Sequence, residues 1–226
     1  MKKNKPHLLF ITPGFPSDEN DTRCIPAMHL FLSALAKTEQ VKVSVIALDY
    51  PYQAKVYKWK NLKIHAIGGN NKGGLLKLRT YRRAIKTALS IHQKEAIARI
   101  HSFWLGDAAL VGNQLKKKLN ILHSCTLMGQ DVLRENNYFK RFKKLPELIT
   151  LSDYHTKALE KNFGIVPLTT IPWGIENLQN TEETRPIDLI GVGNLTQLKL
   201  FSRMVYVVSE LKKTIPNIKA VIVGEG

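Results

Sequence analysis

Leu8-Leu-Phe-Ile-Thr12 and Val41-Lys-Val-Ser-Val-Ile-Ala-Leu48 are apolar runs of strand length, and residues 25–37 lie between them. The first run ends at Pro13-Gly14, a pair that interrupts regular structure. Within residues 25–37 the apolar side chains recur at helical spacing, at Met28, Phe31, Leu32 and Leu35. Strand, helix and strand in this order predict a βαβ unit, whose parallel strands are buried on both faces.

The same alternation continues along the chain. It predicts further strands at residues 62–67, 98–101, 121–127, 148–151 and 168–171, and helices at 75–92, 108–119 and 154–163. So many short alternating elements predict a doubly wound α/β domain with a parallel sheet over residues 1–176.

A polar stretch at residues 177–186 is expected to be a linker. Beyond it the alternation restarts with a strand at 187–192, a helix at 200–213 and a strand at 218–223. One βαβ unit of about 40 residues cannot bury its own faces. Residues 187–226 are therefore interpreted as the truncated start of a second domain.

The charge of the chain favours anionic partners. The 226 residues include 34 Lys and Arg against 18 Asp and Glu, a net charge of +16. Basic clusters occupy residues 77–86, 116–118 and 140–144. They are read either as solvated helix faces or as a docking surface for an anionic membrane. Nucleic acid is not expected, because no RRM, KH or helix-turn-helix pattern accompanies the charge.

Targeting and metal signals are absent from the sequence. No stretch approaches the roughly 18 apolar residues of a membrane helix, and no leader pattern precedes residue 12. The protein is expected in the cytoplasm, with peripheral contact at the inner face of the membrane as an open alternative. Cys24 and Cys125 have neither disulfide nor metal spacing and are expected to be free thiols. No HExxH motif or other metal cluster is present, so no metal is expected.

Two glycine signals are incomplete. Residues 69–74 have the glycine spacing of a P-loop, but Leu75-Leu76 stands where Lys-Ser/Thr must follow, so a plain turn is predicted. Gly191-Val-Gly193 follows a strand, but Thr196 occupies the third glycine position of a dinucleotide fingerprint. No nicotinamide or flavin cofactor is therefore expected.

Three loops fall at the carboxyl ends of predicted strands, where an open α/β sheet holds its ligands. They are Pro13-Gly14-Phe15-Pro16, His101-Ser-Phe-Trp104-Leu-Gly-Asp107 and Thr126-Leu-Met-Gly129-Gln-Asp131. Glycine in such loops lets backbone N–H groups approach a ligand closely. Asp131 has two readings, as a cap of the following helix or as a ligand of a sugar hydroxyl.

Several segments in this order resemble the retaining glycosyltransferases of the GT-B fold, group 1 or family 4, with Rossmann-like domains. The resemblance spans nearly the whole chain, and its motifs are Ile100-His-Ser-Phe-Trp-Leu105, Thr126-Leu-Met-Gly-Gln-Asp131, Leu151-Ser-Asp153, Ile171-Pro-Trp-Gly-Ile-Glu176 and the 187–226 segment.

This resemblance implies transfer of a hexosyl group from a nucleotide-diphosphate sugar, held in the second domain, to a saccharide or lipid-linked acceptor in the first. The setting implied is cell-surface polysaccharide biosynthesis, without a cofactor or metal. The residues implied for donor or phosphate binding are Gly14, Arg23, Gly129, Gly193, Asn194 and Lys199. Those implied for the acceptor are His101, Trp104 and Asp107, and those for catalysis are Met128 and Asp131.

Two departures from the family pattern keep other functions open. Met128 stands where the family has histidine, and a thioether cannot carry a proton. Asn194 stands where a diphosphate-binding arginine is expected, and a neutral amide supplies no charge. The alternatives are a catalytically inert sugar-phosphate binding or scaffold module, and a basic interaction domain. The glutamate-rich donor segment of the family is not found before Gly226, so this chain is not expected to turn over substrate alone.

Overall fold

The computed structural model describes residues 5–21, 23–175 and 185–225 of the chain. The chain divides into two compact units, Met1–Glu176 and Asn177–Gly226. Strands of the two units belong to separate sheets, one of eight strands and one of two. Most of the expected linker, residues 177–184, lies outside the described residues.

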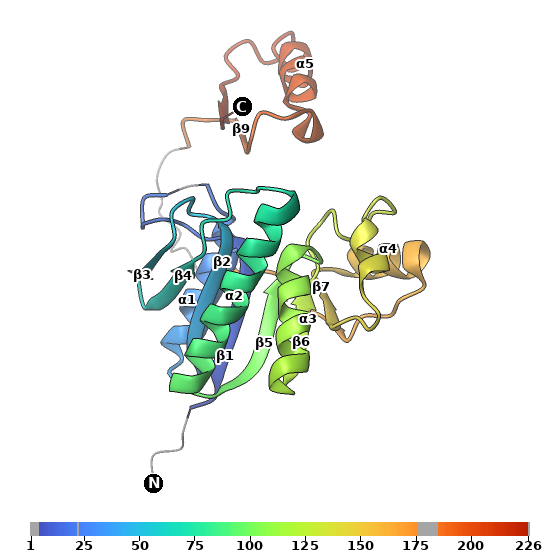
Figure 1. Ribbon diagram of the computed structural model, residues 1–226. Helices are drawn as coiled ribbons and strands as arrows, with labels where there is room; N and C mark the ends of the chain where they lie inside the picture. Colours follow the sequence, from blue (N-terminus) through green and yellow to red (C-terminus); the bar gives the residue numbers. More distant parts are fainter. Residues whose placement is uncertain (1–4, 22, 176–184, 226) are drawn as a thin grey trace. The chain divides into compact units, whose positions relative to one another are not determined.

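The first unit is built on the eight-stranded sheet, with the strand order β3-β4-β2-β1-β5-β6-β7-β8 (Figure 1). Its strands are β1 (His7–Gly14), β2 (Lys42–Tyr50), β3 (Lys55–Trp59), β4 (Leu62–Ala66), β5 (Ile97–Phe103), β6 (Leu122–Thr126), β7 (Glu147–Thr150) and β8 (Thr169–Thr170). Neighbouring strands are parallel except β3 and β4, which form an antiparallel pair.

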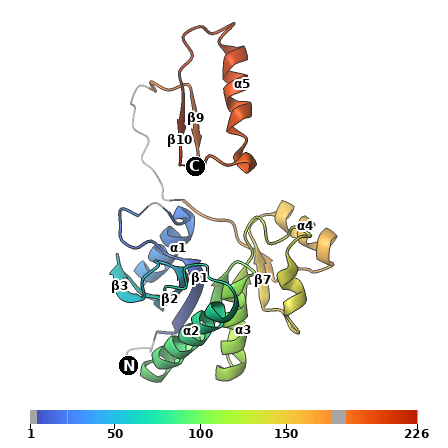
Figure 2. The same ribbon diagram turned by 45° about the horizontal axis from the view of Figure 1, so that its top comes forward.

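Helices cover both faces of this sheet. They are α1 (Pro26–Lys37), α2 (Gly74–Lys94), α3 (Asp107–Leu119) and α4 (Asp153–Phe163), with the 3-10 helix η1 (Asn137–Arg141) before β7. Figures 1 and 2 show α2 and α3 side by side on one face, whereas α1 lies on the other. The sequence predicted a doubly wound parallel sheet, and this arrangement confirms it.

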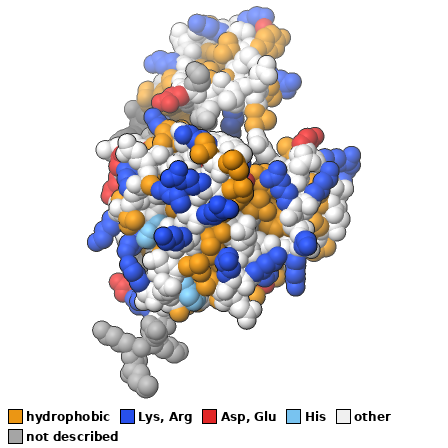
Figure 3. All heavy atoms as spheres, in the orientation of Figure 1, with side chains coloured by type: hydrophobic (Ala, Val, Ile, Leu, Met, Phe, Trp, Pro, Cys, Tyr) orange, Lys and Arg blue, Asp and Glu red, His pale blue; other side chains and the backbone are white. Residues whose placement is uncertain are grey.

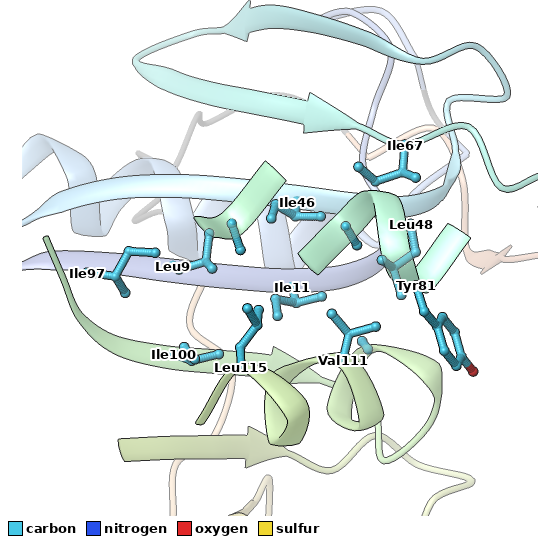
Figure 4. Packing of buried hydrophobic residues seen from close by; sticks show 13 residues of the cluster. Leu9, Ile11, Ile46, Leu48, Ile67, Tyr81, Ile97, Ile100, Val111 and Leu115 are labelled. Atoms are coloured by element: carbon cyan, nitrogen blue, oxygen red, sulfur yellow. The ribbon is translucent and has the colours of Figure 1, made fainter. Parts of the chain in front are cut away.

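Two apolar cores hold the layers together. The core between the sheet and the helices α2 and α3 contains Leu9, Ile11, Ile46, Val111 and Leu115 (Figure 4). On the other face α1 packs on a second core, whose members include the alternate residues of β1 and β2. Apolar residues on both faces of one strand are the pattern of a buried parallel sheet, as the run from residue 8 to 12 indicated.

The strand order reverses between β1 and β5. From β1 the chain first builds β2, β3 and β4 on one side, then returns to place β5 beside β1 and continues to β8 on the other side. His7 of β1 accordingly pairs with Lys42 of β2 and with Ile97 of β5. Such a reversal creates a crevice outside the carboxyl ends of the two strands, where open α/β sheets bind ligands.

The second unit is a single βαβ unit. It contains β9 (Leu189–Val192), the 3-10 helix η2 (Gln197–Lys199), α5 (Phe201–Leu211) and β10 (Ala220–Val223). β9 and β10 pair in parallel, as the restarted alternation predicted. Ile190 and Val192 of β9 remain largely exposed, because one helix cannot cover both faces of two strands.

The strand β3 was not predicted from the sequence. Its residues mix lysines with Val56, Tyr57 and Trp59, and the pattern was too short to be distinguished from a loop. Pairing with β4 and burial of Trp59, which is 2% exposed, make it a strand. The predicted turn after β4 is confirmed, with Asn70 and Asn71 in the left-handed region.

Both cysteines are free thiols, as expected. In the part of the chain that the structure describes, no helix is long and apolar enough to cross a membrane. The same residues contain no group of His, Cys, Asp and Glu side chains that could hold a metal ion.

Candidate functional site

A cavity of about 300 Å³ opens at the reversal between β1 and β5. Its lining comes from three strand ends and from the start of α1: Pro13, Gly14, Arg23, Cys24, Ile25, Met28, Asp49, Tyr50, Tyr52, Asn71 and Trp104. We call it the switch-point cavity. It brings the predicted residues Gly14, Arg23 and Trp104 together.

Gly14 holds the first loop close to β2. A Cβ atom at this position would lie 3.3 Å from Tyr50 Cβ and 3.6 Å from Cys24 Sγ. The next residue, Phe15, donates its backbone N–H to the Tyr50 carbonyl at 3.1 Å. Glycine at this position therefore allows the close approach of β1 to β2 beside the cavity.

Trp104 has a strained backbone. Its φ of 66° lies in the left-handed region, which is uncommon for a bulky aromatic residue. Its N–H donates to the Thr126 carbonyl at 3.0 Å, and the next N–H, that of Leu105, donates to Asp131 at 2.9 Å. Strain that is held by bonds on both sides of a residue is typical of functional positions. This backbone conformation presents the Trp104 indole to the cavity.

The charges of the cavity are Arg23 and Asp49. The Arg23 guanidinium lies 5.6 Å from the centre of the Tyr50 ring, and Tyr50 donates its hydroxyl to Asp21. Burial raises the pKa of the Asp49 carboxyl, although it accepts an N–H bond from Asn71 at 3.1 Å. Burial likewise raises the pKa of the Cys24 thiol to about 12, which makes it a poor nucleophile at neutral pH.

Asp131 anchors two loops. Its side chain is 7% exposed, and its Oδ2 accepts the N–H of Leu105 at 2.9 Å and of Met128 at 2.8 Å. These donors begin the loops that follow β5 and β6. Burial raises the pKa of Asp131 to about 6, and the two N–H bonds oppose that shift. These bonds go to residues that precede Asp131 and not to the N–H groups of a following helix, so the anchoring is neither the helix cap nor the sugar contact expected from sequence.

The predicted catalytic role of Met128 and Asp131 gains no support from their surroundings. Met128 is 6% exposed, and its carbonyl is bonded to His155 Nε2 at 3.2 Å. A catalytic group must touch the substrate, and both side chains are buried. Gly129, in the same loop, has open space where a Cβ would stand, so no close approach requires glycine there.

His101 and Asp107 do not join Trp104 at the switch-point cavity. The ring nitrogens of His101 bond to Ser124 Oγ at 2.9 Å and to Thr126 Oγ1 at 3.0 Å. Burial lowers its pKa to about 3. His101 lines a different cavity, of about 250 Å³ and mostly apolar, with Phe31 and Trp173 beside α1. His101 lies within β5, whereas Trp104 follows the end of that strand, and the motif alone does not reveal this difference.

Asp107 is the centre of a hydrogen-bond hub. It accepts bonds from Tyr138 Oη at 2.6 Å and from Tyr81, and it pairs with Lys77 Nζ at 2.7 Å. Burial opposes its ionisation, but the bonds from Lys77 and the two tyrosines outweigh burial and lower its pKa. The hub ties α2, α3 and η1 together and leaves Asp107 little capacity for an acceptor hydroxyl.

In the second unit the predicted donor residues lie close together. The Lys199 side chain runs past Gly193, with Cε 3.8 Å from the position of a Gly193 Cβ. A Cβ at Gly224 would lie 1.9 Å from the Gly193 carbonyl oxygen, so only glycine fits there. Asn194 adjoins them, and its carbonyl accepts the N–H of Thr196 at 2.8 Å. These residues surround the carboxyl ends of β9 and β10.

Sequence reasoning missed Asp49, Tyr50 and Gly224 as site residues. Asp49 and Tyr50 end β2, and Gly224 follows β10, so each stands at the sheet edge that binds ligands. Their position at the ends of predicted strands was the signal in the sequence that could have identified them. For Asp49 and Tyr50 it becomes decisive only when the strand order places β2 next to β1.

No family model and no curated protein matches the sequence. Solved structures do match in fold. Sucrose-phosphate synthase from Thermosynechococcus elongatus is 14% identical, with a TM-score of 0.63 over 99% of this chain and 71% of that chain. The α,α-trehalose 6-phosphate synthase from Burkholderia multivorans is 10% identical, with a TM-score of 0.58 over 98% and 63%.

UDP-N-acetylglucosamine 2-epimerase from Rickettsia bellii is also 10% identical, with a TM-score of 0.52 over 97% of this chain and 62% of that chain. This chain thus spans less than two thirds of the length of the last two proteins. One of the three is an epimerase, so the shared fold does not by itself select the reaction. The likeness confirms the fold that the motifs indicated: this chain has the architecture of GT-B glycosyltransferase-type proteins.

Proposed function

We propose that this chain is part of a retaining glycosyltransferase that moves a hexosyl group from a nucleotide-diphosphate sugar to a saccharide or lipid-linked acceptor, in the synthesis of a cell-surface polysaccharide. The observation that carries the proposal is the grouping of Lys199 with Gly193 and Gly224 at the carboxyl ends of β9 and β10. The likeness to sucrose-phosphate and trehalose 6-phosphate synthases supports it.

The chemistry of this grouping suits a diphosphate leaving group. Negative charge grows on the diphosphate oxygen as the glycosidic bond breaks, and a fixed cation stabilises that charge. Lys199 supplies the cation, and glycines leave room for phosphate oxygens to approach the backbone. The donor is a substrate, and the proposal includes no resident cofactor or metal.

The acceptor is assigned to the switch-point cavity of the first unit. Its volume of about 300 Å³ lies at the lower end of the range for small-molecule sites. The Trp104 indole offers an apolar surface with a polar edge, which suits a sugar ring. Arg23 supplies hydrogen-bond donors and Asp49 supplies a hydrogen-bond acceptor for the hydroxyl groups of a sugar.

The donor assignment is tested with a single substitution and a matched control. Calorimetric titration of the chain with UDP-, GDP- and ADP-glucose is expected to give saturable binding of one of them. Lys199→Ala is expected to weaken it about tenfold or more, because a hydrogen bond to a charged group is worth roughly 1.5–3 kcal/mol. Lys212→Ala removes an equal charge from the same unit and is expected to leave affinity within about twofold.

Binding of none of the three nucleotide sugars, or equal losses in both variants, contradicts the donor site. A binding but inert module is the second candidate, and burial of Met128 and the neutral Asn194 favour it. Incubation of the chain, and of a longer form extending beyond Gly226, with radiolabelled donor and oligosaccharide acceptors separates the two. Label incorporated into acceptor by the longer form supports transfer, and tight binding without incorporation supports the inert module.

A further inference from the structure

A larger cavity lies at the opposite edge of the first sheet. Its volume is about 720 Å³, and it borders the amino ends of β2 and β4 and the second half of α2. Four of its lining residues are lysines, Lys42, Lys63, Lys86 and Lys94, and Glu95 is the acidic one. We call this cavity the basic groove. Lys86 belongs to the basic cluster at residues 77–86, and none of the residues predicted for the donor, the acceptor or catalysis lines the groove.

The basic groove exists because β4 and α2 depart from the usual pattern of a helix packed on a sheet. Leu62, Ile64 and Ala66 of β4 are buried on the α1 side, so the alternate residues Lys63 and His65 face the α2 side. Facing side chains in such a layer are normally apolar and fill the space between helix and sheet. Here they are charged or polar, and the space stays open.

The opposite wall is a stripe along α2. Lys86, Ser90 and Lys94 recur four residues apart and therefore share one side of the helix. Thr87 adds a half-buried hydroxyl beside them. Figure 3 shows Lys and Arg side chains gathered over α2 on this face of the molecule.

Positive charge in the groove exceeds negative charge. Glu95 pairs with Lys42, and it lies 4.0 Å from His7 Nδ1. Lys63, Lys86 and Lys94 form no ion pair with any residue of the described ranges. Lys94 is partly compensated by the carbonyl end of α2, which favours a cation. Lys63 and Lys86, on opposite walls, have no such compensation.

The floor is polar and ordered. His7 Nε2 bonds to Ser44 Oγ at 2.9 Å, and these side chains are 5% and 7% exposed. Burial, together with the nearby charges of Lys63, Lys94 and His7, lowers the pKa of His65 to about 4. His65 therefore reports a positive potential to which both walls contribute.

We propose that the basic groove binds an anion carrying two or more phosphate groups, at a site separate from the switch-point cavity and from Lys199. Three lysines without an ion-pair partner among the described residues match the charge of such a ligand, and lysines with hydroxyl donors are common partners of phosphate oxygens. The volume exceeds what a single inorganic phosphate needs and falls within the range of small-molecule sites. The ligand is either a free phosphorylated molecule or a phospholipid headgroup, which share this chemistry.

Inorganic triphosphate is the probe. Calorimetric titration of the chain is expected to give a saturable site, which Lys63→Ala/Lys86→Ala weakens about tenfold or more. Lys117→Ala/Lys118→Ala removes the same charge from exposed positions of α3 and is expected to change the affinity less than about twofold. Lys199→Ala is expected to leave this site intact, which separates it from the proposed donor site. Circular dichroism checks that each variant is folded.

A local readout comes from His65. In an NMR titration, saturating triphosphate is expected to raise the His65 pKa, because a nearby negative charge favours the imidazolium. An unchanged His65 pKa, non-saturable binding, or equal losses in the two double variants would overturn the proposal. Vesicles that contain cardiolipin, whose headgroup carries two phosphates, and vesicles of phosphatidylcholine alone identify the source. If triphosphate displaces the binding to cardiolipin and the groove variant loses it, the ligand is a lipid headgroup. If the groove variant retains the binding to cardiolipin, the ligand is a free anion.

Discussion

Asp131 is the residue whose role changes most between motif and structure. Its carboxylate holds the N–H groups of Leu105 and Met128, and so joins the loops after β5 and β6. We expect Asp131→Ala to lower the free energy of unfolding by about 2–4 kcal/mol, because two buried N–H groups lose their acceptor. Asp131→Asn keeps one acceptor oxygen and should lose less. Urea denaturation at pH 7 measures both, and equal losses would contradict the anchoring role.

The same residue predicts a pH dependence. Folding raises its pKa from 3.8 to about 6, so the folded state holds this proton more tightly than the unfolded state. The resulting contribution to stability is complete below about pH 4 and is lost as the pH rises through about 6. The stability of the native chain relative to Asp131→Asn should therefore fall between those values. A difference that stays constant across them would show that the carboxyl titrates normally.

Trp104 illustrates what a motif conveys about a single residue. The motif marked this tryptophan together with its neighbours His101 and Asp107. It could not show that Trp104 has a φ of 66°, or that the three side chains have different surroundings. The strained backbone of Trp104 is held by bonds to Thr126 and Asp131, which a short motif does not contain.

Among the elements, α3 and β6 approach each other closely at Gly112. A Cβ at Gly112 would lie 2.4 Å from His123 Nε2, the atom that bonds to Ser102 Oγ at 3.0 Å. Gly112→Ala should therefore destabilise the fold by about 1–3 kcal/mol through overpacking. Helix propensity alone would make Gly112→Ala stabilising by roughly 1 kcal/mol. A net loss of stability would therefore identify the steric clash with His123.

A double-mutant cycle isolates this contact. In a His123→Ala background the clash is absent, and Gly112→Ala should become neutral or stabilising. Thermal and urea denaturation of the four proteins give the coupling energy. Stabilisation by Gly112→Ala in the native background would mean that α3 moves away from β6 at little cost.

The helices and most strands could be predicted from local pattern, and β3 could not. Residues 8 to 12 and residues 26 to 37 carry apolar side chains at the spacing of a strand and of a helix, respectively. These side chains must be buried on one face of the element or on both. Two of the five residues of β3 are lysines, and its extended conformation comes from pairing with β4 and from the burial of Trp59. An edge strand of this kind is set by its neighbour more than by its own sequence.

For the molecule as a whole, the net charge of +16 is the dominant electrostatic property. Like charges repel more strongly in the compact state than in the unfolded chain, and salt screens that repulsion. Raising KCl from about 10 to about 150 mM shortens the screening length from roughly 30 to 8 Å, so the thermal midpoint should rise by a few degrees. Sucrose at equal osmolality serves as the uncharged reference. A midpoint that falls with KCl would indicate that attractive ion pairs outweigh the repulsion.

The sequence by itself determined the strand–helix alternation, its restart at residue 187 and the edge of the sheet at which ligands should bind, because periodicity and burial act locally. Only the tertiary structure decided which loops meet at that edge. β1 pairs with both β2 and β5, and this order gathers Gly14, Asp49 and Trp104 around one cavity and turns His101 to another. The basic groove was likewise decided by the tertiary structure: the sequence marked the basic cluster at residues 77–86, but not that Lys86 would share a cavity with Lys42 of β2 and Lys63 of β4. Contacts between distant segments arise from the packing of whole layers, which no local pattern encodes.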